Sequence, residues 1–128
     1  AYEGMAVRFR QQLNENAKML CWHHIVPEMN HNELVGWRNK NENLAVIFFR
    51  NDSDYTRNQK RLEINKEVVS KYTSSVMEYW SKGTSMIEKT FYFVNVGDHV
   101  SYILSERNGV VAEEIEVINN LKGALAKF

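Results

Sequence analysis

The residues whose types could bind a metal ion cluster between positions 23 and 33. They are His23, His24, Glu28, His31 and Glu33. Imidazole and carboxylate groups are common zinc ligands, so a metal site is one hypothesis. However, no two histidines here are four residues apart on a helix, Pro27 interrupts the group, and adjacent side chains tend to point apart. We therefore expect no bound metal, and we interpret His23 and His24 as polar surface or buried hydrogen-bonding groups at a strand edge.

Two other features could do chemistry, a cysteine and a basic run. Cys21 is the single cysteine; nothing near it in the sequence predicts the lowered pKa that a reactive thiol needs, so we assign it no role. The run Arg57–Arg61 could bind phosphate or nucleic acid from a helix face. It contains no aromatic residues for base stacking, and Glu63 and Glu67 balance its charge, so we interpret it as a solvated helix face.

Composition excludes several classes of protein. The chain has 128 residues, 44% of them hydrophobic and 25% charged, which is typical of one globular domain and excludes disorder. Its formal net charge is zero, so we predict neither nucleic acid nor membrane partners. The longest apolar run, 44–49, is far below the roughly 20 residues that span a bilayer. With a single cysteine and no signal peptide, we expect a soluble, cytoplasmic protein.

Known cofactor motifs are also missing from the sequence. There is no glycine-rich dinucleotide or phosphate loop, no nucleophile elbow and no paired-cysteine motif, so we predict no cofactor. The chain begins at Ala1, inside an apparent helix and without an initiator methionine. We expect it to be a piece of a longer polypeptide.

Hydrophobic spacing predicts the elements of the first half. Apolar residues three or four apart predict a helix from Tyr2 that ends before Pro27, with one stripe facing a core: Ala6, Phe9, Leu13, Ala17 and Leu20. Residues 19–26 could form a short strand. The segment Pro27–Trp37 is interpreted as a loop that enters a short helix ending near Gly36. The continuous apolar run Leu44–Phe49 predicts a central parallel strand, covered on both faces.

The second half continues the alternation of helix and strand. After the turn residues 51–54 we predict a charged surface helix through Val69, and then a strand over Ser74–Trp80. A capping box at Ser85–Glu88 starts a long helix that ends at Gly109. The last helix has an apolar stripe, with Glu113 and Glu114 in its first turn; the stripe consists of Ile115, Ile118, Leu121 and Leu125. The expected fold is α/β, a single domain over residues 1–128 with a small, mainly parallel sheet flanked by helices.

Two asparagine-rich segments carry a resemblance to a known family. Gln12–Lys18 reads QLNENAK, and Pro27–Trp37 reads PEMNHNELVGW. Together they resemble the C-terminal half of bacterial and archaeal bifunctional phosphoglucose/phosphomannose isomerases, which belong to the sugar isomerase (SIS) superfamily. The resemblance extends along most of the chain, and it implies a flavodoxin-like, three-layer half domain.

The resemblance also implies a reaction and its residues. Glu15 would correspond to the catalytic base, His31 to the histidine that assists opening of the sugar ring, and Lys122 to a third active-site position. These types suit proton transfer through an enediol, which interconverts glucose 6-phosphate or mannose 6-phosphate with fructose 6-phosphate without a metal. From its position alone, each of the three residues would be interpreted as a solvated polar group. Asn30 and Asn32 would cap the short helix and orient His31.

The resemblance implies that part of the enzyme lies outside this sequence. Such enzymes are about twice as long, and the serine and threonine loops that hold the sugar phosphate lie in their N-terminal SIS domain. We therefore expect that missing domain as a partner, a homodimer with shared active sites, and no activity from the isolated fragment. Two alternatives stay open: a phosphosugar-binding SIS domain without catalysis, and a metal-dependent sugar isomerase that uses the histidine cluster.

Overall fold

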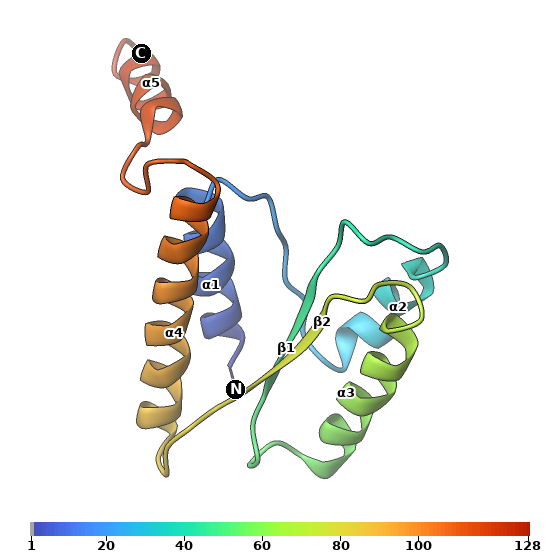
Figure 1. Cartoon of the computed structure of the whole chain (residues 1–128). Coiled ribbons are helices and arrows are strands. Elements are labelled where there is room, and N and C mark those ends of the chain that lie inside the picture. The colour runs from blue at the N-terminus through green and yellow to red at the C-terminus, as the bar shows by residue number, and fades with distance from the viewer. Residues whose placement is uncertain (1) are drawn as a thin grey trace. The chain divides into compact units, whose positions relative to one another are not determined.

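The computed structural model describes residues 2–128. It divides into two compact units, one containing residues 2–3 and 23–92 and the other residues 4–22 and 93–128. Eight elements follow in chain order (Figure 1): α1 (Glu3–Glu15), the 3-10 helix η1 (Glu28–Asn30), α2 (Glu33–Gly36), β1 (Val46–Arg50), α3 (Thr56–Val69), β2 (Val76–Trp80), α4 (Met86–Arg107) and α5 (Glu116–Leu125). The predicted α/β class is confirmed.

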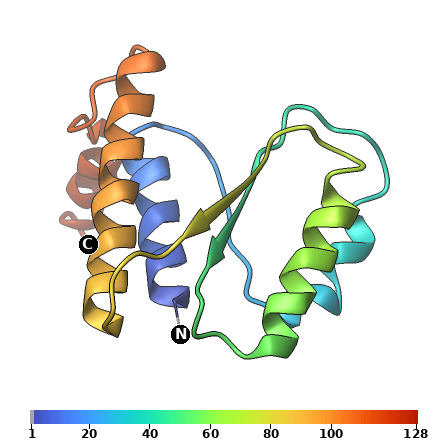
Figure 2. The same cartoon turned by 60° about the horizontal axis from the view of Figure 1, so that its bottom comes forward.

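The first unit is built on a parallel pair of strands. β1 and β2 pair from Val46 opposite Val76 to Arg50 opposite Trp80. Their inward face meets α3 in a small core of Phe48, Leu62 and Val69, which are at most 8% exposed. Both views show η1 and α2 beside α3 (Figures 1 and 2). The strands predicted over 44–49 and 74–80 are thus present and parallel.

Two strand predictions were wrong. Within residues 2–128 the sheet has two strands, so β1 is an edge strand; Ile47 of β1 and its pairing partner Met77 of β2 are 38% and 48% exposed. A continuous apolar run indicates that both faces of a strand are apolar. Whether other elements cover both faces depends on residues elsewhere in the chain. Residues 19–26 form no strand, so His23 and His24 do not lie at a strand edge.

The start of α4 confirms the predicted capping box. The Glu88 carboxylate accepts hydrogen bonds from the backbone N–H groups of Thr84 and Ser85, both at 2.8 Å, and the Ser85 hydroxyl accepts from the N–H of Glu88. These donors lower the pKa of Glu88 to about 2. Gly83 precedes this cap with a φ of +120°, a conformation that residues with a Cβ rarely adopt.

In the second unit, α1 packs along α4, as both views show (Figures 1 and 2). A Cβ at Gly97 would lie 2.9 Å from the Phe9 ring, so glycine permits the close approach of the two helices. Next to it, the Asp98 carboxylate accepts hydrogen bonds from Arg8 and Gln12 at 2.8 Å. Gly97 and Asp98 have low helix propensity, yet α4 continues through both of them. Their contacts with α1 offset that low propensity.

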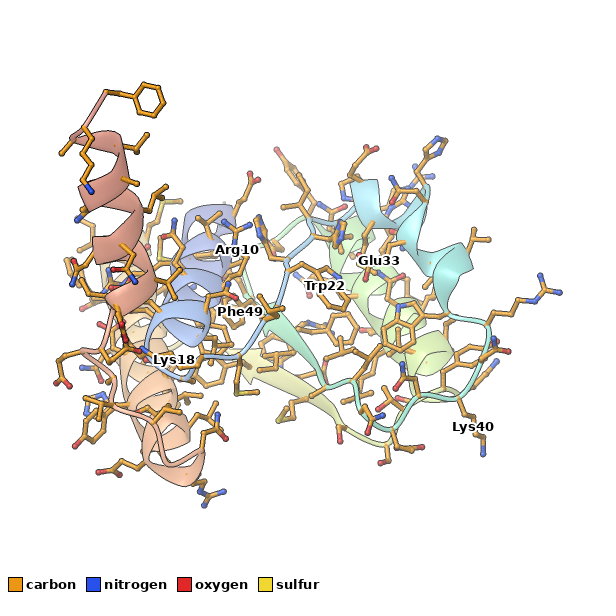
Figure 3. The ribbon with its side chains drawn as sticks, turned by 90° about the horizontal axis from the view of Figure 1, so that it is seen from above. Arg10, Lys18, Trp22, Glu33, Lys40 and Phe49 are labelled. Carbon is orange, nitrogen blue, oxygen red and sulfur yellow. The ribbon has the colours of Figure 1, made fainter. Side chains whose placement is uncertain are left out.

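α1 is shorter than its apolar stripe predicts. It ends at Glu15, and Lys18 has a φ of +56°, which ends helical geometry. The Lys18 ammonium donates hydrogen bonds to the carbonyl oxygens of Glu15 and Glu114 at 2.6 Å, and Figure 3 labels this side chain. Ala17 is buried as expected, but Leu20 is 97% exposed, so its assignment to the core was wrong.

α5 forms over the predicted stripe, but its apolar side chains are exposed. Leu121 and Leu125 are 59% and 60% exposed, and Val117 is 82% exposed. Glu113 and Glu114 precede the helix, and Glu116 is the acid in its first turn, so that boundary prediction was wrong by a few residues. No helix within residues 2–128 is long and apolar enough to cross a membrane.

Candidate functional site

Glu15 lines an open cavity in the second unit. The cavity has a volume of about 510 Å³ and is lined by Arg10, Gln11, Asn14, Glu15, Leu20, Cys21 and Ile118. Within the described residues, the Glu15 side chain makes no hydrogen bond or ion pair, and it is exposed. Its position as the last residue of α1 places it where the helix gives way to the 16–22 segment. The carboxylate is therefore available to accept a proton from a ligand in this cavity.

Arg10 and Cys21 set the electrostatics of the same cavity. Burial raises the pKa of the Cys21 thiol, and the nearby Arg10 guanidinium opposes this effect only in part. The thiol lies 3.6 Å from the Arg10 carbonyl oxygen. A raised pKa leaves little thiolate at neutral pH, which agrees with the absence of a predicted role for Cys21.

Lys122 lies on α5 in the same unit as Glu15. Its ammonium group makes no hydrogen bond or ion pair with another described residue, and it is exposed. Ile118, one helical turn earlier, lines the Glu15 cavity. Because residues four apart share a helix face, Lys122 lies on the face of α5 that borders this cavity.

His31 lines a separate cavity in the first unit. This open cavity has a volume of about 470 Å³ and is lined by Pro27, Glu28, Asn30, His31 and Arg61. The His31 backbone N–H donates to the Glu28 carbonyl oxygen at 2.9 Å and closes η1. Its imidazole is exposed and makes no hydrogen bond within residues 2–128. The ring nitrogens are therefore available to a ligand.

The two asparagines beside His31 have different roles. Asn32 caps α2, because its Oδ1 accepts a hydrogen bond from the Glu33 N–H at 2.6 Å, as predicted. Asn30 does not cap a helix; its amide donates to the Oδ1 of Asn65, which is buried on α3. The two contacts hold His31 between a helix start and the body of the unit.

The histidine cluster does not form a metal site. No three His, Cys, Asp or Glu side chains of residues 2–128 converge as ligands would. His24 instead pairs with Glu33 at 2.7 Å, and Glu33 is labelled on α2 in Figure 3. His24 therefore serves local structure.

The three predicted site residues fall in two units. Glu15 and Lys122 belong to the second unit, and His31 belongs to the first. Sequence reasoning missed Arg61, which it placed on a solvated face; the structure makes this residue half-buried and puts it in the His31 cavity. A signal was available, since Arg61 is four residues before Asn65, a polar residue on the buried side of α3.

Comparison with known proteins identifies the family. The sequence model of one protein family, the bacterial phospho-glucose isomerase C-terminal SIS domain, matches residues 1–125. The chain belongs to this family. Named relatives are the bifunctional phosphoglucose/phosphomannose isomerases of Thermoplasma acidophilum, 31% identical over 94% of this chain, and of Aquifex aeolicus, 30% identical over 96%. A third, from Thermoplasma volcanium, is 29% identical over 98% of the chain.

This chain corresponds to only part of the length of those relatives. The chain spans 38% of the Thermoplasma acidophilum protein, 39% of the Aquifex aeolicus protein and 40% of the Thermoplasma volcanium protein. The family match runs through both compact units. The resemblance noted from the two asparagine-rich segments is thereby confirmed.

Proposed function

We propose that this chain is the C-terminal SIS domain of an aldose-ketose isomerase, which interconverts glucose 6-phosphate and mannose 6-phosphate with fructose 6-phosphate. The family match over residues 1–125 carries this proposal. The exposed, unpaired Glu15 carboxylate in its cavity supports it. The domain acts as part of a longer protein, in line with the share of the relatives that it spans.

In this proposal Glu15 is the base. Its carboxylate removes the proton from carbon 2 of the open-chain aldose phosphate and returns it to carbon 1, through a planar enediol. Because carbon 2 loses its stereochemistry in that intermediate, one site serves the glucose and the mannose epimers. The net reaction moves one proton from carbon 2 to carbon 1 and one from the carbon 2 hydroxyl to the carbon 1 oxygen, and it consumes no cofactor.

His31 and Lys122 assist before and during that transfer. The His31 imidazole donates a proton to the ring oxygen and accepts one from the carbon 1 hydroxyl, which opens the ring. The Lys122 ammonium stabilises the negative charge that develops on the enediol oxygens. Both side chains are exposed and make no ion pair with another described residue, so they are free to act on a substrate.

The rest of the enzyme would come from outside this chain. We propose a preceding SIS domain with serine and threonine loops for the sugar phosphate, and a homodimer in the cytoplasm whose sites use residues of both subunits. The exposed apolar stripe of α5 supports self-association. Sedimentation at high concentration tests it: a monomer would count against the dimer.

The isomerase assignment is tested on the full-length parent protein. We expect conversion of fructose 6-phosphate to both aldose phosphates in the presence of a chelator, and a loss of kcat of about a thousandfold in Glu15→Gln. Glu3→Gln, which removes the same charge at the other end of α1, is the matched control and should keep its kcat. Unchanged activity in Glu15→Gln would reject Glu15 as the base.

A non-catalytic phosphosugar-binding domain is the second candidate. It is favoured if a folded full-length parent binds fructose 6-phosphate but does not convert it. Loss of activity with chelator would instead favour a metal-dependent isomerase.

A further inference from the structure

Lys18 has a backbone conformation that its residue type does not favour. Its φ of +56° lies in the left-handed region, where glycine or asparagine is usual because a longer side chain crowds the backbone. This conformation comes just after α1 ends at Glu15. Since the backbone alone favours another residue type, the reason for a lysine at this position lies in its side chain.

The Lys18 ammonium donates hydrogen bonds to three backbone carbonyl oxygens. They belong to Glu15 and Glu114, both at 2.6 Å, and to Ala112, at 3.4 Å. The Glu15 carbonyl is one of the last four in α1, which have no partner inside the helix, and a cation also compensates the negative end of the helix dipole. The three donors of the ammonium therefore all have acceptors on the protein's own backbone.

The two short bonds join two elements that line the cavity of the proposed base. Glu15 lines this cavity from the end of α1, and Ile118 lines it from α5. Glu114 lies two residues before α5 begins at Glu116. Lys18 thus links the backbone of the proposed base to the start of the helix that forms another wall of its cavity.

The rest of this turn is anchored to α4 and to the residue that follows it. The Asn16 amide donates to the hydroxyl of Ser101, which is 0% exposed, at 3.0 Å. The Ala17 carbonyl oxygen accepts from the Asn108 amide at 2.9 Å. In contrast, the Glu15 side chain makes no hydrogen bond or ion pair with a described residue. The turn therefore holds the backbone in place and leaves the carboxylate available to a ligand.

We propose that Lys18 is a positioning residue of the isomerase reaction, which fixes the backbone from which the Glu15 carboxylate reaches its cavity. This inference rests on the proposed function, because it takes Glu15 as the base. Lys18 acts through Glu15 rather than on the substrate, and a displacement of the base by about 1 Å slows a reaction by about a hundredfold. Because Lys18 is exposed, its hydrogen bonds add little to global stability, so their loss should reduce kcat far more than it reduces the Tm.

Two substitutions in the full-length parent separate the ammonium from the backbone conformation. Lys18→Met removes the charge and keeps the Cβ and most of the side-chain length, whereas Lys18→Gly also removes the Cβ and suits a positive φ. We expect both variants to lose kcat by about tenfold or more, with the KM for fructose 6-phosphate within about threefold of wild type. A wild-type kcat in either variant would overturn the proposal.

Lys127→Met is the matched control for the loss of charge. Lys127 is an exposed lysine of the same unit, and its ammonium makes no hydrogen bond or ion pair with a described residue. We expect Lys127→Met to keep the wild-type kcat. A loss of kcat equal to that of Lys18→Met would show a general effect of charge and would overturn the positioning role.

Ring opening provides a readout that separates positioning from a merely structural role. In the proposed mechanism His31 opens the ring, so the enzyme exchanges the two anomers of glucose 6-phosphate without proton transfer at carbon 2. Magnetisation-exchange NMR measures that rate. A displaced Glu15 should slow isomerisation and leave anomer exchange within about twofold of wild type. An equal fall in both rates would reduce Lys18 to a structural role and overturn the proposal.

Hydrogen exchange tests the link to α5 without any activity. In the full-length parent, the amides of residues 114–119 should exchange faster in Lys18→Met and Lys18→Gly than in wild type, and those of α3 should not change. Unchanged exchange at 114–119 would overturn the link. The outcomes also separate this inference from the proposed function: a wild-type kcat in Lys18→Met beside a loss in Glu15→Gln rejects only the positioning role, whereas unchanged activity in Glu15→Gln rejects the base.

Discussion

Replacing Glu78 by Gln should destabilise the first unit, because its carboxylate is shared by two cations. One oxygen accepts from the Arg50 guanidinium and the other from the Lys66 ammonium, both at 2.5 Å. The Arg50 side chain is 3% exposed, and its guanidinium also lies over the Trp80 ring at 4.7 Å. Glu78 therefore neutralises a charge that water cannot reach.

The magnitude follows from that burial. Breaking a buried pair and leaving its partner charged costs about 3–5 kcal/mol. The Glu78 side chain is 21% exposed, and a Gln oxygen still accepts one hydrogen bond from Arg50, so both features reduce the cost. The Nε of Arg50 already lacks a hydrogen-bond partner among residues 2–128, which leaves no spare acceptor nearby. We expect a loss of about 2 kcal/mol in the free energy of unfolding at pH 7.

The effect should depend on pH. The hydrogen bond from Lys66, together with the charges of Arg50 and Lys66, holds the pKa of Glu78 below its ordinary value. A lowered pKa in the folded state stabilises the protein above the pKa of the unfolded chain, and this contribution disappears as the pH falls through the folded pKa. The difference between wild type and Glu78→Gln should thus be largest at neutral pH and shrink towards pH 3.

Urea unfolding followed by circular dichroism at pH 7 and pH 3 measures both quantities. Glu63→Gln is the control, since the Lys60–Glu63 pair is exposed and should leave the urea midpoint unchanged. The reasoning fails if Glu78→Gln unfolds at the wild-type midpoint at pH 7, or if its deficit is the same at pH 3.

Other perturbations probe single contacts. Gly83→Ala should lower stability by more than about 1 kcal/mol in thermal unfolding, because φ is +120° and a Cβ would lie 2.6 Å from the Glu88 Cβ; an unchanged Tm would contradict this. Asn16→Ala should cost about 1 kcal/mol in urea unfolding, since it removes the hydrogen bond to the buried Ser101 hydroxyl; wild-type stability would reject it. Hydrogen exchange at the Ser85 amide, corrected for intrinsic rate, should accelerate as the pH falls from 4.5 towards 2, where Glu88 takes up its proton, and a flat profile would argue against the cap.

Local sequence signals predicted the elements with good accuracy, and the misses have physical causes. The capping box at Ser85–Glu88 and the stop near Gly36 are decided by neighbouring residues, so the sequence contains the answer. The end of α1 is decided by Lys18, whose ammonium reaches the carbonyl oxygen of Glu114, 96 residues away. No window of local periodicity includes such a contact.

The site residues illustrate the same division. Glu15 and His31 came from a resemblance in two short segments, because an exposed glutamate and an exposed histidine give no signal by themselves. Arg61 was interpreted as solvated from the charges around it in sequence. Its place beside His31 depends on the Asn30–Asn65 hydrogen bond, which spans 35 residues. Pairwise contacts of this kind are what the structure adds to the sequence.

α5 shows how a correct pattern can leave its partner undetermined. Its stripe has the helical spacing that usually marks a buried face, and Ile118 is the one member that lines the Glu15 cavity. Of the other three stripe residues, Ile115 is half-buried, whereas Leu121 and Leu125 are more than half exposed. A stripe of this kind usually exists because burying apolar surface stabilises a protein by about 25 cal/mol per Å². α5 also carries Lys122, so a partner that covered the stripe would pack on the helix that bears this proposed site residue.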